Sequence, residues 1–313
     1  MNKAIFFKWY GSIQFAIMVG MLTCSITACN NDGLTAGDPN YFTDSRGQFT
    51  ATITDNVGKE TKLFLIPGAT PGTAIVTYDG ANPRHWQSET VATVRVGTYQ
   101  DQLLIPEKVN IEEQTFTITG IDKEAFMGCR EYVANGITYW NGLKSITLPE
   151  TVTELGEGAF ALTDLIEVNL PQSISKLPFG CFGSCTKLAT IHVPGTITSI
   201  GEMAFYGCTS ATDLTLDEGV EQIGKMAFFD CPKLTEVTLP SSVKVIGDKA
   251  FGGRDSRRSK IAIYHIKATT PPTLEGILYE ADESITPIIY VPTGCAATYQ
   301  AATGWNKLTI EEE

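Results

Sequence analysis

The sequence predicts a mainly β solenoid of about six 23-residue coils with short helical turns, preceded by a small N-terminal β module and closed by a C-terminal cap. Three observations predict this fold. A phrase of Ile-Gly, two further residues and Ala-Phe recurs, its phenylalanines fall at nearly equal intervals, and most copies are preceded by apolar residues two apart and then a proline. Such repetition indicates one structural unit made several times and stacked.

The first 28 residues have the composition of a secretory signal. They hold Lys3 and Lys8, no acidic residue, and an apolar stretch that ends at Ile26-Thr27-Ala28-Cys29. A small residue before cysteine at this point resembles a bacterial lipobox, which makes Cys29 the expected lipid-attachment residue. The alternative is an uncleaved membrane anchor, although the apolar run is short and interrupted for a membrane span.

Residues 29–40 are rich in Asn, Asp, Gly and Pro, and they are typical of a flexible tether. Asn30 directly after the cysteine favours the outer membrane, by resemblance to Gram-negative lipoproteins. We therefore expect an outer-membrane lipoprotein that is exposed at the cell surface.

The charge of the chain argues against nucleic acid as a partner. The formal net charge is −12, and removal of residues 1–28 subtracts Lys3 and Lys8, which gives −14. Proteins that bind nucleic acid neutralise phosphates with lysine and arginine, and this chain has an excess of carboxylates.

Residues 41–102 lie before the clear repeats and predict a small β module. The segments FTATIT, KLFLI, AIVTY and VATVRV cluster β-forming residues between turn residues. We expect this module to act as an N-terminal cap, with Leu103 to Val109 as a degenerate strand and proline of the first coil. A free-standing immunoglobulin-like domain is the alternative.

Six copies of the repeat align on one phenylalanine, with gaps of 34, 22, 23, 23 and 23 residues. The aligned residues are Phe126, Phe160, Phe182, Phe205, Phe228 and Phe251. Five residues before them stand Ile121, Leu155, Leu177, Ile200, Ile223 and Ile246, and eight before stand Ile118, Val152, Ile174, Ile197, Val220 and Val243. Both columns are apolar throughout, which predicts a continuous core.

Each copy predicts one coil. Residues two apart, such as Val237 and Leu239, place their side chains on one face of a short strand, which the next proline ends. Val243 and Ile246 predict a second short extended piece, and the Ala-Phe-x-x-Cys stretch is long enough for about one helical turn. Because a coil of 23 residues cannot bury its own faces, the coils stack. Spacing and pattern together predict a leucine-rich repeat solenoid over residues 103–270.

The phrase LPxxVxxIGxxAFxxCxxLxxVxLP resembles the BspA-like leucine-rich repeat surface proteins of Bacteroidota, over roughly residues 103 to 291. The ending from Ile288 to Trp305 also resembles the closing segment of that family, which implies a last strand, a short helix bearing Tyr299 and then a tryptophan. Residues 271–313 are therefore the expected cap. The resemblance implies adhesion to host proteins or to other bacteria.

No residue constellation predicts catalysis, a cofactor or a metal. Cys129, Cys185, Cys208 and Cys231 each follow an aligned phenylalanine by three residues, so we expect small buried side chains stacked one above the next. Disulfides between them are the less favoured alternative, because parallel side chains keep their β-carbons apart. The spacing also offers no close pairs for zinc. His85, His192 and His265 are scattered, with no nucleophile motif beside them.

Two surfaces are candidates for partner binding. Exposed strand positions are expected at Ser145, Thr147, Glu167, Asn169, Thr190, His192, Asp213, Thr215, Glu236 and Thr238. They form either a binding face or an ordinary solvated sheet. The 34-residue gap holds eleven residues more than the usual 23, and these place Tyr132, Tyr139 and Trp140 in an insertion. Such aromatics either anchor a partner or fold back over the coil edge.

The sequence therefore predicts a cell-surface lipoprotein without enzymatic activity, whose solenoid binds a protein or glycoprotein at host or bacterial surfaces. The residues proposed for binding are Tyr132, Tyr139, Trp140, Glu167, His192, Asp213 and Glu236. The alternatives are a component of an envelope scaffold and a module that captures glycans. The contact with the membrane is expected through the N-terminal lipid.

Overall fold

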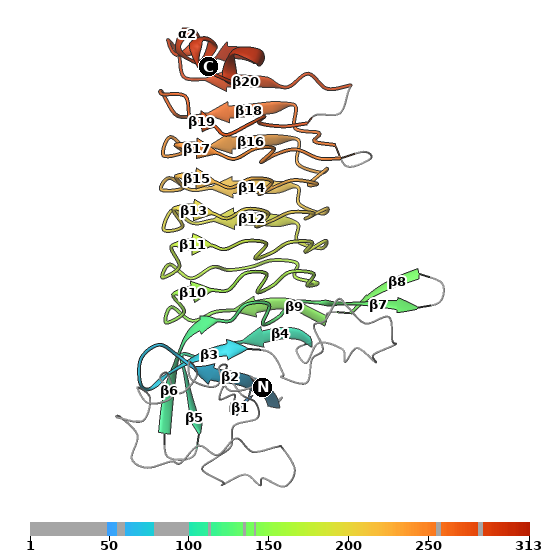
Figure 1. Cartoon of the computed structure of the whole chain (residues 1–313), viewed down its shortest axis with the longest axis vertical. Helices are drawn as coiled ribbons and strands as arrows, with labels where there is room; N and C mark the ends of the chain where they lie inside the picture. Colours follow the sequence, from blue (N-terminus) through green and yellow to red (C-terminus); the bar gives the residue numbers. More distant parts are fainter. Residues whose placement is uncertain are drawn as a thin grey trace, which may run out of the picture.

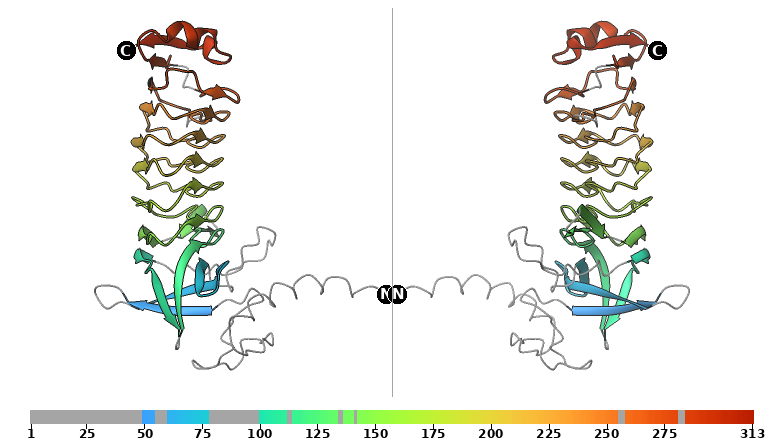
Figure 2. Two further views of the ribbon diagram at one scale, coloured as in Figure 1. Left: turned by 90° about the vertical axis from the view of Figure 1, so that its left-hand side faces the viewer. Right: turned by 90° about the vertical axis from the view of Figure 1, so that its right-hand side faces the viewer.

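A computed structural model describes residues 49–54, 60–77, 100–111, 114–133, 136–140, 142–254, 258–280 and 284–313. It shows a straight column of stacked coils with an N-terminal sheet at one end and a short helix, α2 (Ala296–Ala301), at the other (Figure 1, Figure 2). The predicted fold class is confirmed. The expected signal, tether and lipid-attachment residue Cys29 lie outside the described residues.

The N-terminal sheet is continuous with the first coil. Its strands run in the order β1-β2-β3-β6-β10, and β5 pairs with β6. Their bounds are β1 Phe49–Thr54, β2 Glu60–Pro67, β3 Thr73–Thr77, β5 Lys108–Ile111, β6 Gln114–Ile121 and β10 Glu154–Leu155. The two outer pairs, β1 with β2 and β2 with β3, are antiparallel, whereas β6 pairs parallel with both β3 and β10. One strand, β6, thus joins the module to the solenoid. The expected strand VATVRV lies outside the described residues.

The solenoid has two rows of parallel strands, of which the longer strands pair in three sheets, β4-β9, β12-β14 and β16-β18-β20-β21. The longer strands are β4 Gln100–Leu104, β9 Gly142–Thr147, β12 Thr190–Val193, β14 Asp213–Leu216, β16 Glu236–Leu239, β18 Ile263–Ile266, β20 Ile288–Val291 and β21 Thr309–Glu312. The row of shorter strands, in the order β11-β13-β15-β17-β19, consists of Lys176–Leu177, Ser199–Ile200, Gln222–Ile223, Val245–Ile246 and Thr273–Leu274. A single bridge joins Thr147 to Asn169 where one copy forms no full strand.

A column of stacked phenylalanines runs through the core. Neighbouring rings from Phe126 to Phe251 have centroids 5.2–5.4 Å apart and lie within 9° of parallel. Each ring is at most 3% exposed. The backbone of each coil also bonds to the next, as in Phe205 N to Ala227 O at 2.8 Å. Stacking the same residue in every coil thus buries the apolar side chains and pairs the backbone polar groups of one coil with those of the next.

The segment before each core phenylalanine makes tight turns rather than a regular helix. The residue two positions before the ring has φ between 53° and 60° in all six copies, including the non-glycines Met203 and Met226. Four of the six copies have glycine two positions earlier, and the close approach of the coils requires it there: a Cβ on Gly224 would lie 2.6 Å from Glu202 N. The repeated Ile-Gly phrase therefore marks where one backbone crosses the next.

The C-terminal cap covers the last coil as the resemblance implied. Tyr299 on α2 and Trp305 in the 3₁₀ helix η2 (Trp305–Lys307) are fully buried and meet edge to face, with centroids 5.1 Å apart. The Tyr299 hydroxyl donates to Ala268 O at 2.7 Å, and Trp305 Nε1 donates to Pro272 O at 2.7 Å. Two large side chains thus close the core and satisfy carbonyls of the preceding coil.

Candidate functional site

The longer strands present an exposed polar face along the column. The core side chains of β12, β14 and β16 point inward, and the residues between them point outward because successive side chains alternate. Nine of the ten positions expected on this face are exposed, and Ser145 is partly buried. The pairing Thr190↔Asp213 and His192↔Thr215 fixes the neighbours across coils. Nine of the ten positions are thus exposed as expected, and their role in binding stays a prediction.

The charged residues of this strand face differ in how far they are already engaged. His192 Nε2 lies 2.9 Å from Asp217 Oδ2, so this histidine has a partner in the residue that replaces the usual proline. Asp213 accepts a hydrogen bond from the Thr212 hydroxyl at 2.8 Å. Glu167 makes no ion pair or hydrogen bond with any residue that the structure describes. Glu167 is thus the most available carboxylate of the face.

Near the C-terminal end of the face, Glu236 belongs to a cluster around His265. His265 Nε2 lies 3.1 Å from Glu236 Oε1, and its Nδ1 lies 2.6 Å from Glu313 Oε2. The imidazole also stacks on Tyr290 at 5.4 Å, and Lys267 reaches Glu313 at 3.3 Å. Burial tends to raise the pKa of Glu313, but the contacts with His265 and Lys267 outweigh it and hold that pKa below its ordinary value.

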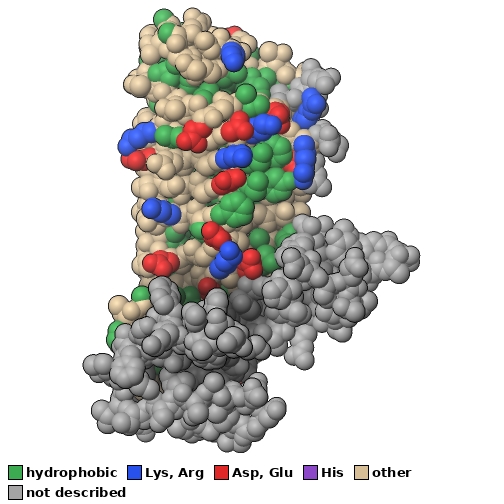
Figure 3. Space-filling view, viewed as in Figure 1, with side chains coloured by type: hydrophobic (Ala, Val, Ile, Leu, Met, Phe, Trp, Pro, Cys, Tyr) green, Lys and Arg blue, Asp and Glu red, His purple; other side chains and the backbone are tan. Residues whose placement is uncertain are grey.

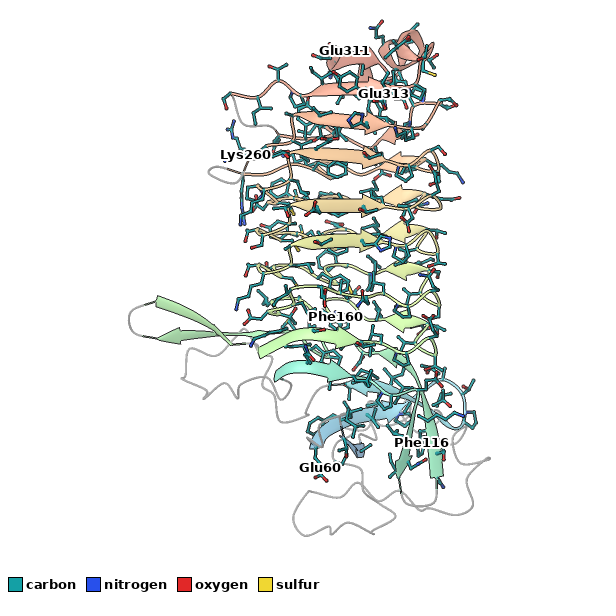
Figure 4. All side chains as sticks on the ribbon, turned by 180° about the vertical axis from the view of Figure 1, so that it is seen from behind. Glu60, Phe116, Phe160, Lys260, Glu311 and Glu313 are labelled. Atoms are coloured by element: carbon teal, nitrogen blue, oxygen red, sulfur yellow. The ribbon has the colours of Figure 1, made fainter. Side chains whose placement is uncertain are left out.

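The insertion in the first gap forms a β-hairpin. Strands β7 (Cys129–Val133) and β8 (Gly136–Trp140) pair antiparallel, with Tyr132 opposite Ile137 and Arg130 opposite Tyr139. The hairpin projects sideways from the column (Figure 1, Figure 4). All three predicted aromatic residues, including Trp140, therefore belong to one protruding element. It is separate from the strand-face residues Glu167, His192, Asp213 and Glu236.

A cluster that the sequence reasoning missed lies on the turns. The Asp230 side chain is completely buried, and its Oδ1 accepts from Arg254 N at 3.0 Å and its Oδ2 from Arg254 Nε at 3.2 Å. The Tyr206 hydroxyl accepts from Arg254 Nη2 and lies 3.4 Å from Asp230 Oδ2. The guanidinium carbon lies 5.8 Å from the Tyr206 ring centroid. Tyr206 and Asp230 raise the pKa of Arg254 above its ordinary value.

The signal for this cluster was present in the repeat columns. The residue after each core phenylalanine is alanine or glycine in three of the six copies but is Tyr206 and Phe229 in two successive ones, whose rings stack at 5.8 Å. The next copy has Gly252, where a Cβ would lie 2.9 Å from the Phe229 ring. Arg254 takes the column position that cysteine holds in most copies. Tyr206, Phe229 and Arg254 thus depart from the repeat pattern in neighbouring copies, and this departure is the sequence signal for the cluster.

The cysteines whose side chains are described are free, and Cys185, Cys208 and Cys231 form a buried stack, whereas Cys295 is partly buried. Cys185 Sγ lies 3.1 Å from Phe160 O, Cys208 Sγ lies 3.4 Å from Phe182 O, and Cys231 Sγ lies 3.5 Å from Phe205 O. Burial raises the pKa of Cys185 to about 11 and that of Cys231 to about 12. These thiols are core side chains, because a reactive cysteine needs a lowered pKa and exposure.

Among the described residues, no group of three or more His, Cys, Asp or Glu side chains is placed to hold a metal ion. Within the same ranges, the helices are too short or too polar to cross a membrane.

Comparisons with known proteins identify a family model that the repeats match. Residues 131–257 match, in six copies, the family described as "BspA type Leucine rich repeat region". Among curated proteins no match to the chain was found.

Solved structures similar to the chain include three bacterial proteins. One is a leucine-rich repeat protein from Bacteroides ovatus, at 17% identity and a TM-score of 0.43, which covers 80% of this chain and 75% of that one. A leucine-rich cell surface protein from Faecalibacterium prausnitzii has 23% identity and a TM-score of 0.46, with 78% and 65% covered. The pneumococcal vaccine antigen PcpA has 16% identity and a TM-score of 0.47, with 84% and 64% covered. The chain thus spans less than two thirds of the last two structures. The chain thus folds as a leucine-rich-repeat-type β-solenoid, and its residues 131–257 match the model of the BspA-type repeat.

Proposed function

We propose that the protein is a cell-surface lipoprotein whose solenoid binds a macromolecular partner without catalysis, and that it serves as an adhesin for a host or bacterial surface protein. The observation that carries the proposal is the strand face, in which exposed polar side chains recur in register from coil to coil. Stacked coils repeat at the spacing of neighbouring strands, about 4.8 Å, so the face extends along the column. Repeat proteins use such extended surfaces to bind other proteins.

The chemistry of the face supports binding rather than turnover. Its charged side chains are spread over several coils, and His192 and His265 are on β12 and β18, with their partners on the same exposed surface. A catalytic site needs an acid, a base or a nucleophile brought together in a concave, water-excluding place. An open array of Thr, Asn, Glu and Asp side chains instead offers many separate hydrogen bonds to a partner.

The proposed location rests on the sequence of the N-terminal segment. A lipid on Cys29 and the tether of residues 29–40 would hold the column near the outer membrane and leave its sides accessible. Adhesion requires this accessibility, because a partner on another cell must reach the strand face or the hairpin.

An unbiased capture experiment tests the proposal. Residues 33–313 are immobilised and incubated with solubilised host-cell and bacterial surface proteins, and the bound proteins are identified by mass spectrometry. The matched bait carries Glu167→Gln, Asp213→Asn and Glu236→Gln, which keep the shapes of the side chains and remove their charges. A host or foreign bacterial protein that the parent captures and the variant loses supports adhesion through this face. Capture of the producing cell's own envelope proteins alone would instead favour the scaffold alternative.

A further inference from the structure

One edge of the acidic column is basic. Lys233, Arg254 and Lys260 are exposed, and we call these three residues the basic edge. Lys260 is labelled at this side of the stack in Figure 4, and Figure 3 shows lysine or arginine side chains at the same edge of the upper coils as well as elsewhere on that face. Because the whole chain carries a net charge of −12, this grouping of positive charge stands apart from the rest of the molecule.

Arg254 is held in a fixed position with part of its guanidinium available. Its Nε–H is directed to Asp230, and one Nη2 hydrogen is directed to the Tyr206 hydroxyl. A guanidinium has five N–H donors, so three remain without a partner among the described residues. The side chain is 63% exposed although its partner Asp230 is fully buried. A buried carboxylate thus orients a cation that faces solvent.

The two lysines stand at equivalent positions of neighbouring coils. Strands β16 and β18 pair Glu236 with Ile263, and Lys233 and Lys260 each stand three residues before these partners. Neither lysine makes an ion pair with a residue that the structure describes. Lys233 also follows Asp230, the residue that holds Arg254, by three positions in the chain. The basic edge therefore combines one guanidinium that is held in position with two lysine ammonium groups that have no described ion-pair partner.

We propose that the basic edge is a second binding site, which takes a short acidic peptide segment of a partner protein through a carboxylate on Arg254. The free Nη donors of a held guanidinium match the two oxygens of a carboxylate, and Lys233 and Lys260 can pair with the next acidic residues. A tyrosine beside the fork adds an apolar wall for the peptide. This site is distinct from the strand face and does not depend on its proposed function.

The charge balance favours a short peptide over an extended polyanion. A sulfated glycan or nucleic acid presents many charges, and most would lie near the carboxylates of a chain with net charge −12. At physiological salt, charges more than about 8 Å apart are largely screened. A segment with two or three carboxylates therefore feels chiefly the local cations, whereas a long polyanion meets repulsion beyond them.

The test is a binding measurement on the full chain in detergent. The probe is a fluorescent ten-residue peptide with three glutamates among serines, and the reference peptide has glutamine in their place. Arg254→Lys keeps the charge and removes the fork, so it should weaken binding by about fivefold to tenfold. Lys233→Gln with Lys260→Gln should weaken it by about threefold or more. The matched control, Lys108→Gln with Lys176→Gln, loses the same charge from exposed positions elsewhere and should leave binding within about 1.5-fold.

Each other result overturns part or all of the proposal. Equal binding of the glutamate and glutamine peptides by the parent would mean that no carboxylate site exists. Parent-like binding by Arg254→Lys would refute recognition by the fork, and equal losses in the lysine pair and its control would refute the location. A heparin hexasaccharide that binds more tightly, with the same dependence on these variants, would replace the peptide as occupant. Neither Lys233 nor Lys260 makes an ion pair with a described residue. Their double variant therefore still tests the site if Arg254→Lys lowers the melting temperature.

Discussion

At the scale of single residues, the phenylalanine column carries much of the stability of the stack. Phe205 is fully buried between the rings of Phe182 and Phe228, at 5.3 and 5.4 Å. Its removal would leave a cavity that both neighbouring coils line, because the backbones are fixed by their hydrogen bonds and cannot close it. Aromatic truncations of this kind lose transfer free energy and also create a void.

We therefore expect Phe205→Ala to lower the free energy of unfolding by about 3–5 kcal/mol. Thr215→Ala, on the exposed side of β14, should lower it by less than about 0.5 kcal/mol. Urea denaturation followed by circular dichroism measures both. Equal midpoints for the two variants would contradict the division between core column and strand face.

The buried thiols predict a loss of stability in alkali. Burial raises the pKa of Cys185 to about 11 and that of Cys231 to about 12 in the folded protein, above the ordinary value of a thiol. The folded state therefore keeps protons that the unfolded state releases, so the stabilisation is complete below about pH 9 and declines as pH rises toward 11. Each thiol lowers the free energy of unfolding by up to about 1.4 kcal/mol per pH unit in this window.

Urea denaturation at pH 7, 9 and 10 with a phosphine reductant measures this decline. The comparison is the double variant Cys185→Ala with Cys231→Ala, which has a lower stability throughout but should show a shallower decline above pH 9. Identical slopes in parent and variant would show that other groups, such as lysines, cause the alkaline loss.

At the scale of elements, periodic features were predictable and single features were not. Aligned columns predicted the strands and the stacked rings because every copy repeats the same packing requirement. The left-handed turns at Met203 and Met226 were missed, since neither residue type favours a positive φ and the neighbouring coil imposes it. The Arg254 cluster joins residues 24 and 48 positions apart, and such a contact follows only from the coil register.

The hairpin β7–β8 provides a test of where a partner binds. Its aromatic residues were expected in an insertion, and the pairing of Gly136–Trp140 with Cys129–Val133 gives that insertion a defined backbone. We expect Tyr139→Ala with Trp140→Ala to weaken binding of a captured partner by at least about 2 kcal/mol, in the manner of a hot spot. Surface plasmon resonance measures the affinity, and the melting temperature should stay nearly unchanged.

The strand-face variant with Glu167→Gln, Asp213→Asn and Glu236→Gln is the comparison for the hairpin. It should change chiefly the association rate and its salt dependence, because exposed carboxylates steer a basic partner more than they hold it. If the hairpin variant binds like the parent and the strand-face variant does not, the partner contact lies on the face alone.

At the scale of the whole molecule, both ends of the column are closed. The N-terminal sheet pairs β6 with β10, and the last strand, β21, follows the buried Tyr299 and Trp305. Open ends of a stack would expose unpaired strands and apolar rings to other chains. With its ends covered, the column can present long sides to partners while its stability comes from contacts between neighbouring coils.

The location of the whole molecule depends on the predicted lipid. We expect Cys29→Ser to leave the chain without lipid and to move it from the outer-membrane fraction to the soluble fraction. One acyl chain binds membranes only marginally, so stable anchoring needs the several chains that a bacterial lipoprotein cysteine carries. Mass spectrometry of the native N-terminus and immunoblots of membrane fractions measure the two effects. Cys24→Ser is the matched control and should stay in the membrane, because Thr23 rather than a small alanine precedes that cysteine. A native N-terminus without lipid on Cys29 would refute the anchor, and an intact signal segment in the membrane fraction would favour the uncleaved alternative.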